Sequence, residues 1–222
     1  EAVPPDARAV DGVLMRVLSY DTLDSTNAEA RRLLAGDAIT TPACIVAREQ
    51  TAGRGTRGRA WCSPGDAGIY LSVVERPARA TPVTVLYTLA AGVACAEAIE
   101  RIAGVVAELR PIIDLWVGGR KLGGILVEAV AERGMLTSIV IGVGVNVRET
   151  PRAVEADAPR PVSIEELMTP SAFAGLEEDA LVREIADRVV TWTAVAARGE
   201  TTPIRRAWAE RCIPGAVVPA IA

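Results

Sequence analysis

Residues 112–147 of this 222-residue chain read IIDLWVGGRKLGGILVEAVAERGMLTSIVIGVGVNV, and this stretch determines the expected architecture. Two apolar runs, residues 112–117 and 121–130, flank Gly118 and Gly119, a pattern typical of a β-hairpin with a two-glycine turn. A second turn at residues 131–134 leads into a third apolar run. We therefore predict a three-stranded antiparallel meander, with Lys121 at the start of its middle strand and Asp114 across the hairpin.

The remaining chain alternates short apolar runs with helical periodicity. Strands are expected at residues 14–18, 43–47 and 69–74, and helices at 27–35, 82–102, 177–196 and 203–211. Residues 1–12 are expected to form a loose leader, and residues 150–161 a proline-punctuated loop. This order predicts an α/β (α+β) fold with a mixed, mostly antiparallel sheet and flanking helices.

The composition excludes several classes of protein. A net charge of −4 argues against a dedicated nucleic-acid binder, which would carry a basic face. No run approaches the roughly 18 apolar residues of a membrane span, and the first residues lack the features of an export signal. The four cysteines contain no CxxC pair, so a disulfide framework or zinc site is not expected and a reducing cytosol fits.

Histidine is absent from the chain, which excludes Ser-His-Asp and Cys-His catalysis. Lys121 is the only lysine among 24 basic residues. This single lysine is either a chance feature of an arginine-rich composition, or it marks a site where an ammonium group must reach a phosphate or carboxylate oxygen.

Residues 49–61, EQTAGRGTRGRAW, are the most unusual segment. The glycines permit close backbone approach, the arginines offer forked donors for phosphate or carboxylate, and Trp61 offers an apolar wall. The segment is neither a Walker A loop nor a GxGxxG turn. It is either a solvated loop or an anion-binding loop, and its place between two strands argues against an RGG-like nucleic-acid tail.

Two polar groups fit more than one interpretation. Ser25, Thr26 and Asn27 either cap the following helix or present its free N–H groups to a ligand. In residues 142–147, the glycines and Asn146 indicate either a bulge or the close approach of a ligand.

Four segments resemble the catalytic domain of biotin–protein ligases. Asp24-Ser25-Thr26-Asn27 matches the family's D-S-T-N. Residues 50–64 match Q-x-A-G-R-G-R-x-G-R-x-W-x-S-P. Residues 114–128 match the end of K-W-P-N-D-L-x-x-x-x-x-K-L-x-G-I-L-x-E, and residues 141–147 match I-G-x-G-x-N. The resemblance covers residues 14–212.

The resemblance implies a class II aminoacyl-tRNA synthetase-like domain that joins biotin and ATP, with Mg²⁺, into biotinyl-5′-AMP. Biotin would then pass to a lysine of a biotin carboxyl carrier protein, in the cytoplasm and without nucleic acid or membrane. Residues 1–13 would be a leader, 14–212 the catalytic domain, and 213–222 a stub where an SH3-like domain would begin. The sequence leaves open whether the protein forms a homodimer.

The resemblance also implies roles for individual residues. Those that would bind biotin are Ser25, Thr26, Gln50, Arg54, Lys121 and Gly123. Those that would bind the nucleotide are Arg57, Arg59, Trp61 and Asn146. Lys121, Asp114 and Arg54 would be catalytic, with Asp114 near the reacting carboxylate and Mg²⁺. Adenylation brings a carboxylate to an anionic phosphate, so concentrated positive charge suits it.

The chain departs from the family pattern at several places. Residues 110–113 read Arg-Pro-Ile-Ile instead of K-W-P-N, so Ile113 replaces an amide. Thr56 replaces a loop arginine; if that arginine retains the adenylate, its loss weakens binding by about 1.5–3 kcal/mol. From the resemblance we expect neither a complete SH3-like domain nor a winged-helix domain in this sequence, so regulation by direct DNA binding is not expected. A monofunctional ligase is favoured over an impaired biotin-binding paralogue, and both over a lipoate–protein ligase.

Overall fold

The computed structural model describes residues 6–10, 13–77, 84–111, 114–132, 135–148 and 159–215. These residues form one eight-stranded sheet, in the order β1-β2-β3-β4-β8-β7-β6-β5. The strands are β1 (Asp6–Val10), β2 (Val13–Leu23), β3 (Ala43–Gln50), β4 (Gly68–Glu75), β5 (Glu108–Arg110), β6 (Asp114–Val117), β7 (Arg120–Glu132) and β8 (Met135–Asn146). The helices are α1 (Thr26–Ala35), α2 (Thr84–Ala103), α3 (Ile164–Leu167), α4 (Pro170–Ala174), α5 (Glu178–Ala197) and α6 (Thr201–Arg211), with the 3₁₀ turn η1 at Thr56–Gly58.

The mixed, mostly antiparallel sheet predicted from the sequence is confirmed. Strands β2 and β3 pair in parallel, and α1 makes the crossover that a parallel pair requires. The other neighbouring strands pair antiparallel. The sheet therefore combines one β-α-β unit with a meander, and their junction is the pairing of β4 with β8.

The predicted meander is also confirmed, as strands β6, β7 and β8. Gly118 and Gly119 join β6 to β7 with φ of +56° and +76°, the left-handed conformation that the tightest hairpin turns demand. Asp114 pairs with Gly124 across this hairpin, and Lys121 pairs with Trp116. The turn therefore sets the register that brings Asp114 and Lys121 to one end of the sheet.

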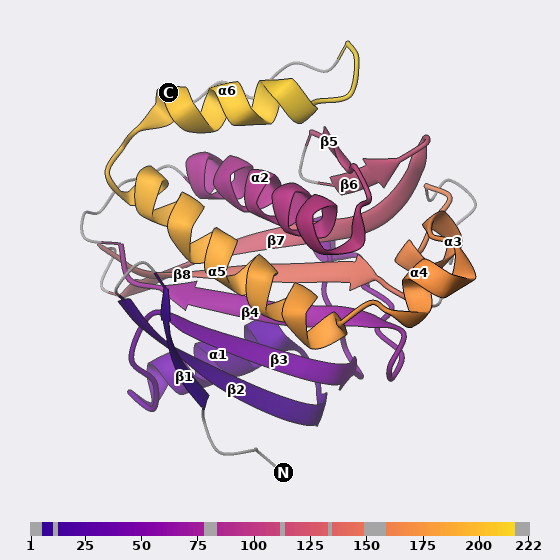
Figure 1. The fold of residues 1–222 in the computed structure, drawn as a ribbon. Helices are drawn as coiled ribbons and strands as arrows, with labels where there is room; N and C mark the ends of the chain where they lie inside the picture. The colour runs from indigo at the N-terminus through magenta and orange to yellow at the C-terminus, as the bar shows by residue number, and fades with distance from the viewer. Residues whose placement is uncertain are drawn as a thin grey trace.

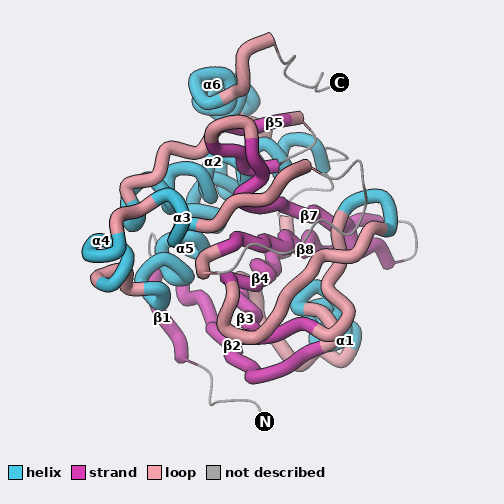
Figure 2. The backbone as a smooth tube through the Cα atoms, turned by 90° about the vertical axis from the view of Figure 1, so that its right-hand side faces the viewer, coloured by secondary structure: helices cyan, strands magenta, loops and turns pink. Residues whose placement is uncertain are grey.

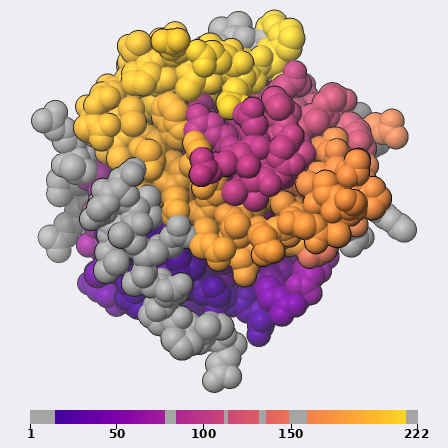
Figure 3. All heavy atoms as spheres, in the orientation of Figure 1, coloured from indigo at the N-terminus to yellow at the C-terminus, as the bar shows by residue number. Residues whose placement is uncertain are grey.

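Helices cover both faces of the sheet (Figures 1 and 2). Helices α2 and α5 pack together on one face with α6 against α2, and they form the continuous yellow, orange and pink surface of Figure 3. Helix α1 lies on the other face against β3, β4 and β8. Strand β4 is covered on both sides, which explains why it reads as an almost unbroken apolar run.

The core has two parts that match these layers. The larger cluster lies between the sheet and α2, α5 and α6, and the smaller cluster lies under α1. Helix α2 is rich in buried alanine, which lets α5 and the sheet approach it closely. No helix among the described residues is long and apolar enough to cross a membrane.

The sequence prediction was wrong at some positions. The loose leader expected over residues 1–12 is a strand at Asp6–Val10, which pairs with β2. Strand β5 and the short helices α3 and α4 were not predicted, because three to five residues carry too little periodicity to indicate an element. Most of the loop expected at residues 150–161 and most of the stub at 213–222 lie outside the described residues.

Candidate active site

A cavity of about 790 Å³ opens on the face of the sheet that carries α1. Its floor comes from β7 and β8, its wall from the start of α1, and its cover from the loop between β3 and β4. Along β8 the alternation of side chains puts Gly142, Gly144 and Asn146 on the cavity side, whereas Ile141 and Val145 pack in the core.

The glycines of β8 make room for two side chains of this chain. A Cβ at Gly142 would collide with Oδ1 of Asn27, and a Cβ at Gly144 would lie 2.5 Å from Nε1 of Trp61. Both distances are shorter than real Cβ contacts allow. The sequence left open a bulge or the close approach of a ligand; in the structure these two glycines instead make room for the side chains of Asn27 and Trp61.

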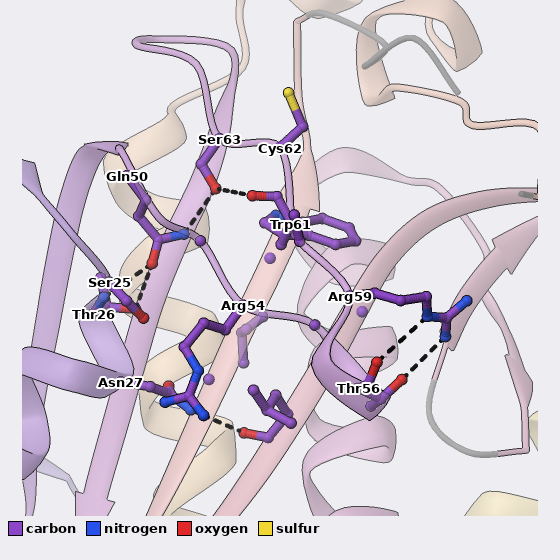
Figure 4. Close-up of a pocket in the computed structure, with 18 of the residues that line it drawn as sticks. Ser25, Thr26, Asn27, Gln50, Arg54, Thr56, Arg59, Trp61, Cys62 and Ser63 are labelled. Atoms are coloured by element: carbon purple, nitrogen blue, oxygen red, sulfur yellow. Dashed lines mark hydrogen bonds between the residues drawn. The ribbon is translucent and has the colours of Figure 1, made fainter. Parts of the chain in front are cut away.

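Gln50 organises one end of the cavity (Figure 4). Its Oε1 accepts from the backbone N–H of Thr26 at 2.9 Å, and its Nε2 donates to Oγ of Ser63 at 2.8 Å. The backbone donor fixes which end of the amide is oxygen, because an N–H can only donate. Ser63 in turn donates to the carbonyl of Trp61 at 3.3 Å, so Gln50 ties α1 to the loop.

A chain of buried polar groups continues from Thr26. Ser72, on β4 and fully buried, lies 2.8 Å from Oγ1 of Thr26 and 2.6 Å from Oδ1 of Asn27. Asn27 then donates through Nδ2 to Oε2 of Glu128 at 2.8 Å. The amide oxygen of Asn27 can only accept, so Ser72 donates to it and accepts from Thr26. The donors therefore run in one direction, from Thr26 to Glu128.

Ser25 occupies the N-cap position of α1, but its side chain makes no capping hydrogen bond. It is 3% exposed and lines the cavity. The neighbouring Asp24 is a structural residue instead, because Arg32 donates two hydrogen bonds to its carboxylate, at 2.7 and 2.8 Å. These bonds lower the pKa of Asp24 to about 2. Because the Ser25 side chain makes no capping hydrogen bond, capping of α1 does not explain why its hydroxyl lines the cavity.

Lys121, Asp114 and Trp61 gather at the other end of the cavity. Nζ of Lys121 lies 2.8 Å from Oδ1 of Asp114 and 5.4 Å from the centre of the Trp61 ring. The side chain of Lys121 is 18% exposed and that of Asp114 is 25% exposed, so both reach the cavity from partly buried positions. The predicted placement of Asp114 across the hairpin from Lys121 is confirmed.

Asn146 fixes the backbone beside Lys121. It is 5% exposed, and its Nδ2 donates to the carbonyls of Val162 at 3.0 Å and Lys121 at 3.4 Å. The backbone N–H of Lys121 donates to the carbonyl of Arg160 at 2.8 Å. The segment after the undescribed residues 149–158 is therefore held against the start of β7, where Pro159 and Pro161 join the cavity wall.

The glycine- and arginine-rich loop has internal structure. Trp61 donates its backbone N–H to the carbonyl of Gly53 at 2.9 Å, and Gly55 donates to Arg59 at 2.7 Å. A Cβ at Gly53 would collide with the carbonyl of Trp61, so glycine is needed there. The Arg54 guanidinium lies 3.1 Å from Oε1 of Glu128, and its side chain points toward Asn27 (Figure 4).

Nine of the predicted site residues line this one cavity. They are Ser25, Thr26, Gln50, Arg54, Arg59, Trp61, Asp114, Lys121 and Asn146. Gly123 does not line it, because Gly123 packs on the carbonyl of Gly144 while Gly124 faces the cavity. Arg57 lines a smaller adjoining cavity. Ile113 lies outside the described residues.

Sequence reasoning missed the roles of Ser72, Glu128 and Ser63. The polar Ser72 within the apolar run of β4 could have indicated a special role. Its partners Asn27 and Thr26 are 45 and 46 residues away in sequence, so no local pattern connects them. Glu128 falls inside a matched motif and received no role. Its carboxylate contacts Asn27, Arg54 and Arg31, so it joins α1 to the loop.

Among the described residues, no group of three or more Cys, Asp and Glu side chains could hold a metal ion by itself. Asp114 and Glu49 are the acidic residues that line the cavity. Mg²⁺ bound to a nucleotide needs only one or two protein carboxylates, because phosphates and water supply its other ligands. Asp114, beside Lys121, therefore fits a Mg²⁺ ion that arrives with a nucleotide.

The structure is an α/β domain whose cavity has a polar, amide-lined end and a cationic end. The sequence model of the biotin/lipoate A/B protein ligase family matches residues 20–146, more than half of the chain. The chain belongs to this family.

A relative in sequence agrees with this assignment, and a solved structure shares the fold. A biotin–[acetyl-CoA-carboxylase] ligase of Paracoccus denitrificans is 34% identical over 85% of this chain and 77% of its own length. The bifunctional ligase/repressor BirA of Bacillus subtilis is 36% identical over 61% of this chain, which spans 41% of that relative. The biotin protein ligase of Aquifex aeolicus, solved with biotin and ATP, shares the fold with a TM-score of 0.72 and 20% identity, covering 89% of this chain and 78% of that one.

Proposed function

We propose that this protein is an ATP-dependent biotin–protein ligase. It forms biotinyl-5′-AMP and transfers biotin to a lysine of a biotin carboxyl carrier protein. The observation that carries the proposal is the placement of Lys121, the only lysine of the chain, at the cationic end of a cavity whose other end is lined by Ser25, Thr26 and Gln50. A substrate with a polar head and a carboxylate tail fits this polarity.

Gln50, Thr26 and Ser25 suit the ureido group of biotin. The ureido oxygen accepts hydrogen bonds and its two N–H groups donate them, so the pocket must offer both kinds of partner. The Thr26 hydroxyl lies 2.8 Å from Oγ of Ser72 and 3.2 Å from Oε1 of Gln50, so its one hydrogen is used within the protein and its lone pairs can accept from a ligand. Nε2 of Gln50 uses one hydrogen on Ser63 and has a second to donate. Ser25 supplies a further hydroxyl on the cavity wall.

Lys121 and Arg54 suit the anions that meet during adenylation. A carboxylate oxygen must approach the α-phosphate, and two anions repel unless fixed cations lie between them. Asp114, at 2.8 Å, holds the ammonium of Lys121 at the cavity, so the cation is in place before a substrate anion arrives. Trp61 forms an apolar wall that suits adenine and excludes water. Bound Mg²⁺ would neutralise phosphate charge.

The second step requires mainly positioning. An amine of the carrier protein attacks the mixed anhydride, which is already activated, and AMP leaves. The arginines of the loop cover would hold the intermediate until the carrier arrives.

The test is ATP–pyrophosphate exchange with biotin, with lipoate and with no acid. Biotin-dependent exchange is expected, with lipoate giving no more than the background. Exchange that depends on lipoate would instead identify a lipoate ligase. Calorimetric binding of biotin without any exchange would contradict the proposal and would identify an impaired biotin-binding protein.

A further inference from the structure

The carboxylate of Glu128, on β7, contacts three side chains from two distant segments of the chain. Its Oε2 accepts from Nδ2 of Asn27 at 2.8 Å. Its Oε1 lies 3.1 Å from the guanidinium of Arg54 and 3.5 Å from that of Arg31. The side chain of Glu128 is 14% exposed, so this is a largely buried anion with several donors around it. Glu128 has no part in the function proposed above.

Glu128 lies behind the wall of the cavity. On β7, Leu126 lines the cavity, whereas Val127 packs against the larger core cluster. The alternation of side chains along a strand therefore puts Glu128 on the cavity face. Its partners Asn27 and Arg54 line the cavity, but Glu128 is not among the lining residues. The carboxylate can thus influence a ligand in the cavity through the side chains that it holds.

Arg54 connects the cover of the cavity to the sheet. Its backbone pairs with Ala60 at the base of the loop, and its side chain reaches Glu128 on β7. Arg59 instead donates to Thr56 within the same loop. In the described part of the chain, no carboxylate besides that of Glu128 forms an ion pair with Arg54. Glu128 is therefore the anchor of the loop arginine.

Both partners depend on this carboxylate for their direction. The side chain of Arg54 is 49% exposed and points toward Asn27 (Figure 4). Without Glu128 the guanidinium would gain rotational freedom in water, because a long side chain loses entropy when it is held in one place. Nδ2 of Asn27 would keep a contact of 3.5 Å to the carbonyl of Leu126. Hydrogen bonds to an ionised acceptor are stronger than neutral ones, so the charge of Glu128 fixes both side chains.

We propose that Glu128 is a positioning residue that sets the affinity of the cavity for biotin. The inference rests on the proposed function. Glu128 does not touch the substrate; it holds Asn27 beside Thr26, and Arg54 beside Asn27, before biotin arrives. Binding then does not have to order these side chains, and affinity gains what ordering would have cost. Lys121 lies at the other end of the cavity, so the chemical step depends less on Glu128.

The variant Glu128→Gln tests the proposal, because it keeps the size of the side chain and removes its charge. The KM for biotin in ATP–pyrophosphate exchange and the calorimetric Kd for biotin should each rise about tenfold, a modest effect because Arg54 is half exposed. The kcat of exchange should change less than about threefold. Glu128→Asp keeps the charge within reach of the flexible Arg54, so it should lose less biotin affinity than Glu128→Gln.

Glu97→Gln is the matched control. Glu97, on α2, lies on the opposite face of the sheet from the cavity and lines neither cavity. It is also a partly buried carboxylate that accepts from an arginine, Arg188, and from a neutral N–H, Nε1 of Trp192 at 3.0 Å. Urea unfolding should show a similar loss of stability in the two variants, whereas biotin affinity should fall in Glu128→Gln alone. Equal losses of biotin affinity would overturn the positioning role.

A double-mutant cycle with Arg54→Met tests whether the effect passes through Arg54. Glu128→Gln should weaken biotin binding clearly less in the Arg54→Met background than in the wild type, because residues that act together give non-additive losses. Fully additive losses would overturn the proposal, and so would wild-type biotin affinity in Glu128→Gln.

The exchange assay separates this proposal from the proposed function. Biotin affinity that depends on Glu128, in a protein without biotin-dependent exchange, would support the positioning role and remove the ligase. Biotin-dependent exchange with an unchanged KM for biotin in Glu128→Gln would remove the positioning role and retain the ligase. Absence of biotin binding in the wild type would overturn both.

Discussion

Lys121 and Asp114 lie on adjacent strands of one hairpin, and their side chains meet with Nζ 2.8 Å from Oδ1. The irregular pairing between Leu115 and Trp116 shifts the register of the hairpin at this point. The contact orients the ammonium without burying it, because 18% of the lysine side chain remains exposed. A cation held in this way can exchange its carboxylate partner for a substrate anion.

The first prediction concerns the size of that cation. In Lys121→Arg the charge is kept, but a planar fork replaces a compact ammonium beside the Trp61 ring. We expect ATP–pyrophosphate exchange to fall at least about a hundredfold, roughly 2.7 kcal/mol of transition-state stabilisation, while biotin binding stays measurable. The measurements are the rate of ATP–pyrophosphate exchange and the affinity for biotin, determined by calorimetry.

Arg120→Lys is the matched control for this experiment. Arg120 is the neighbouring residue, and it pairs with Glu166 at 2.7 Å outside both cavities. Exchange in this variant should equal that of the wild type. Wild-type exchange in Lys121→Arg would remove Lys121 from the mechanism.

The second prediction concerns Ser72, a positioning residue that does not line the cavity. Ser72→Ala removes the group that accepts from Thr26 and donates to Asn27. The free energy of unfolding should fall by about 1–3 kcal/mol, the cost of leaving buried polar groups unpaired. Biotin affinity should fall about tenfold, because Thr26 and Asn27 lose their fixed orientation, and ATP affinity should not change.

Ser138→Ala provides the comparison, because Ser138 is a buried serine of β8 that does not line the cavity. It should leave biotin affinity unchanged. Equal loss of biotin affinity in both variants would show that general destabilisation, and not the hydrogen-bond chain, explains the effect.

The third prediction concerns Thr56, where the family pattern has an arginine. Thr56 lines both cavities and accepts from Nη2 of Arg59 at 3.1 Å. Thr56→Arg adds a charged donor, so release of biotinyl-5′-AMP should slow by about tenfold to a hundredfold. Thr56→Val, which adds no charge, should not slow it. Release that is equally fast in Thr56→Arg would contradict the role assigned to this position.

The fourth prediction concerns the loop over residues 53–61. The cross-loop hydrogen bonds of Trp61 and Gly55 hold its base, whereas Arg57 and Gly58 at its tip are exposed. Hydrogen exchange should therefore be fast at the tip of the empty protein and slower with the adenylate bound. Equal protection in the two states would mean that the loop does not close over the ligand.

The elements that the sequence predicted well are those whose signals are local. The hairpin at Gly118-Gly119 follows from a turn that only glycine suits, and helix α2 follows from twenty residues of helical pattern. The site residues followed from a resemblance between motifs.

The elements that the sequence did not predict depend on contacts between distant segments. Strand β1 has only five residues of mixed polarity, too few to indicate a strand, and it forms by pairing with β2. Ser72 acquires its role from α1, and the stacking of Arg110 on Trp116 follows from a strand of only three residues. Local patterns carry no information on such pairings, so only the structure shows them.

A carboxyl group outside the active site leads to the last prediction. Glu75, at the end of β4, lies 2.5 Å from Oγ1 of Thr193, which also lies 2.6 Å from the carbonyl of Val189. Thr193 has one hydroxyl hydrogen, and neither a carboxylate nor a carbonyl can supply a second. Both contacts are satisfied only when Glu75 is protonated, donating to Thr193 while Thr193 donates to Val189. Burial raises the pKa of Glu75 to about 7 from its ordinary value of 4.5.

The sign of the pH dependence follows from this raised pKa. Between about pH 4.5 and pH 7 the folded protein holds a proton on Glu75 that the unfolded chain has released. Its contribution to stability is therefore present at low pH and is lost as pH rises through 7. The shift from 4.5 to about 7, at about 1.4 kcal/mol per pKa unit, corresponds to roughly 3–4 kcal/mol in all, and roughly 2–3 kcal/mol of it is lost between pH 5 and pH 8. Glu75→Gln cannot ionise, so it should gain that much stability relative to the wild type between pH 5 and pH 8, measured by urea unfolding. Parallel pH profiles for the two proteins would show that Glu75 is already ionised in the folded state at the lower pH, and that the Thr193 hydroxyl donates to it there.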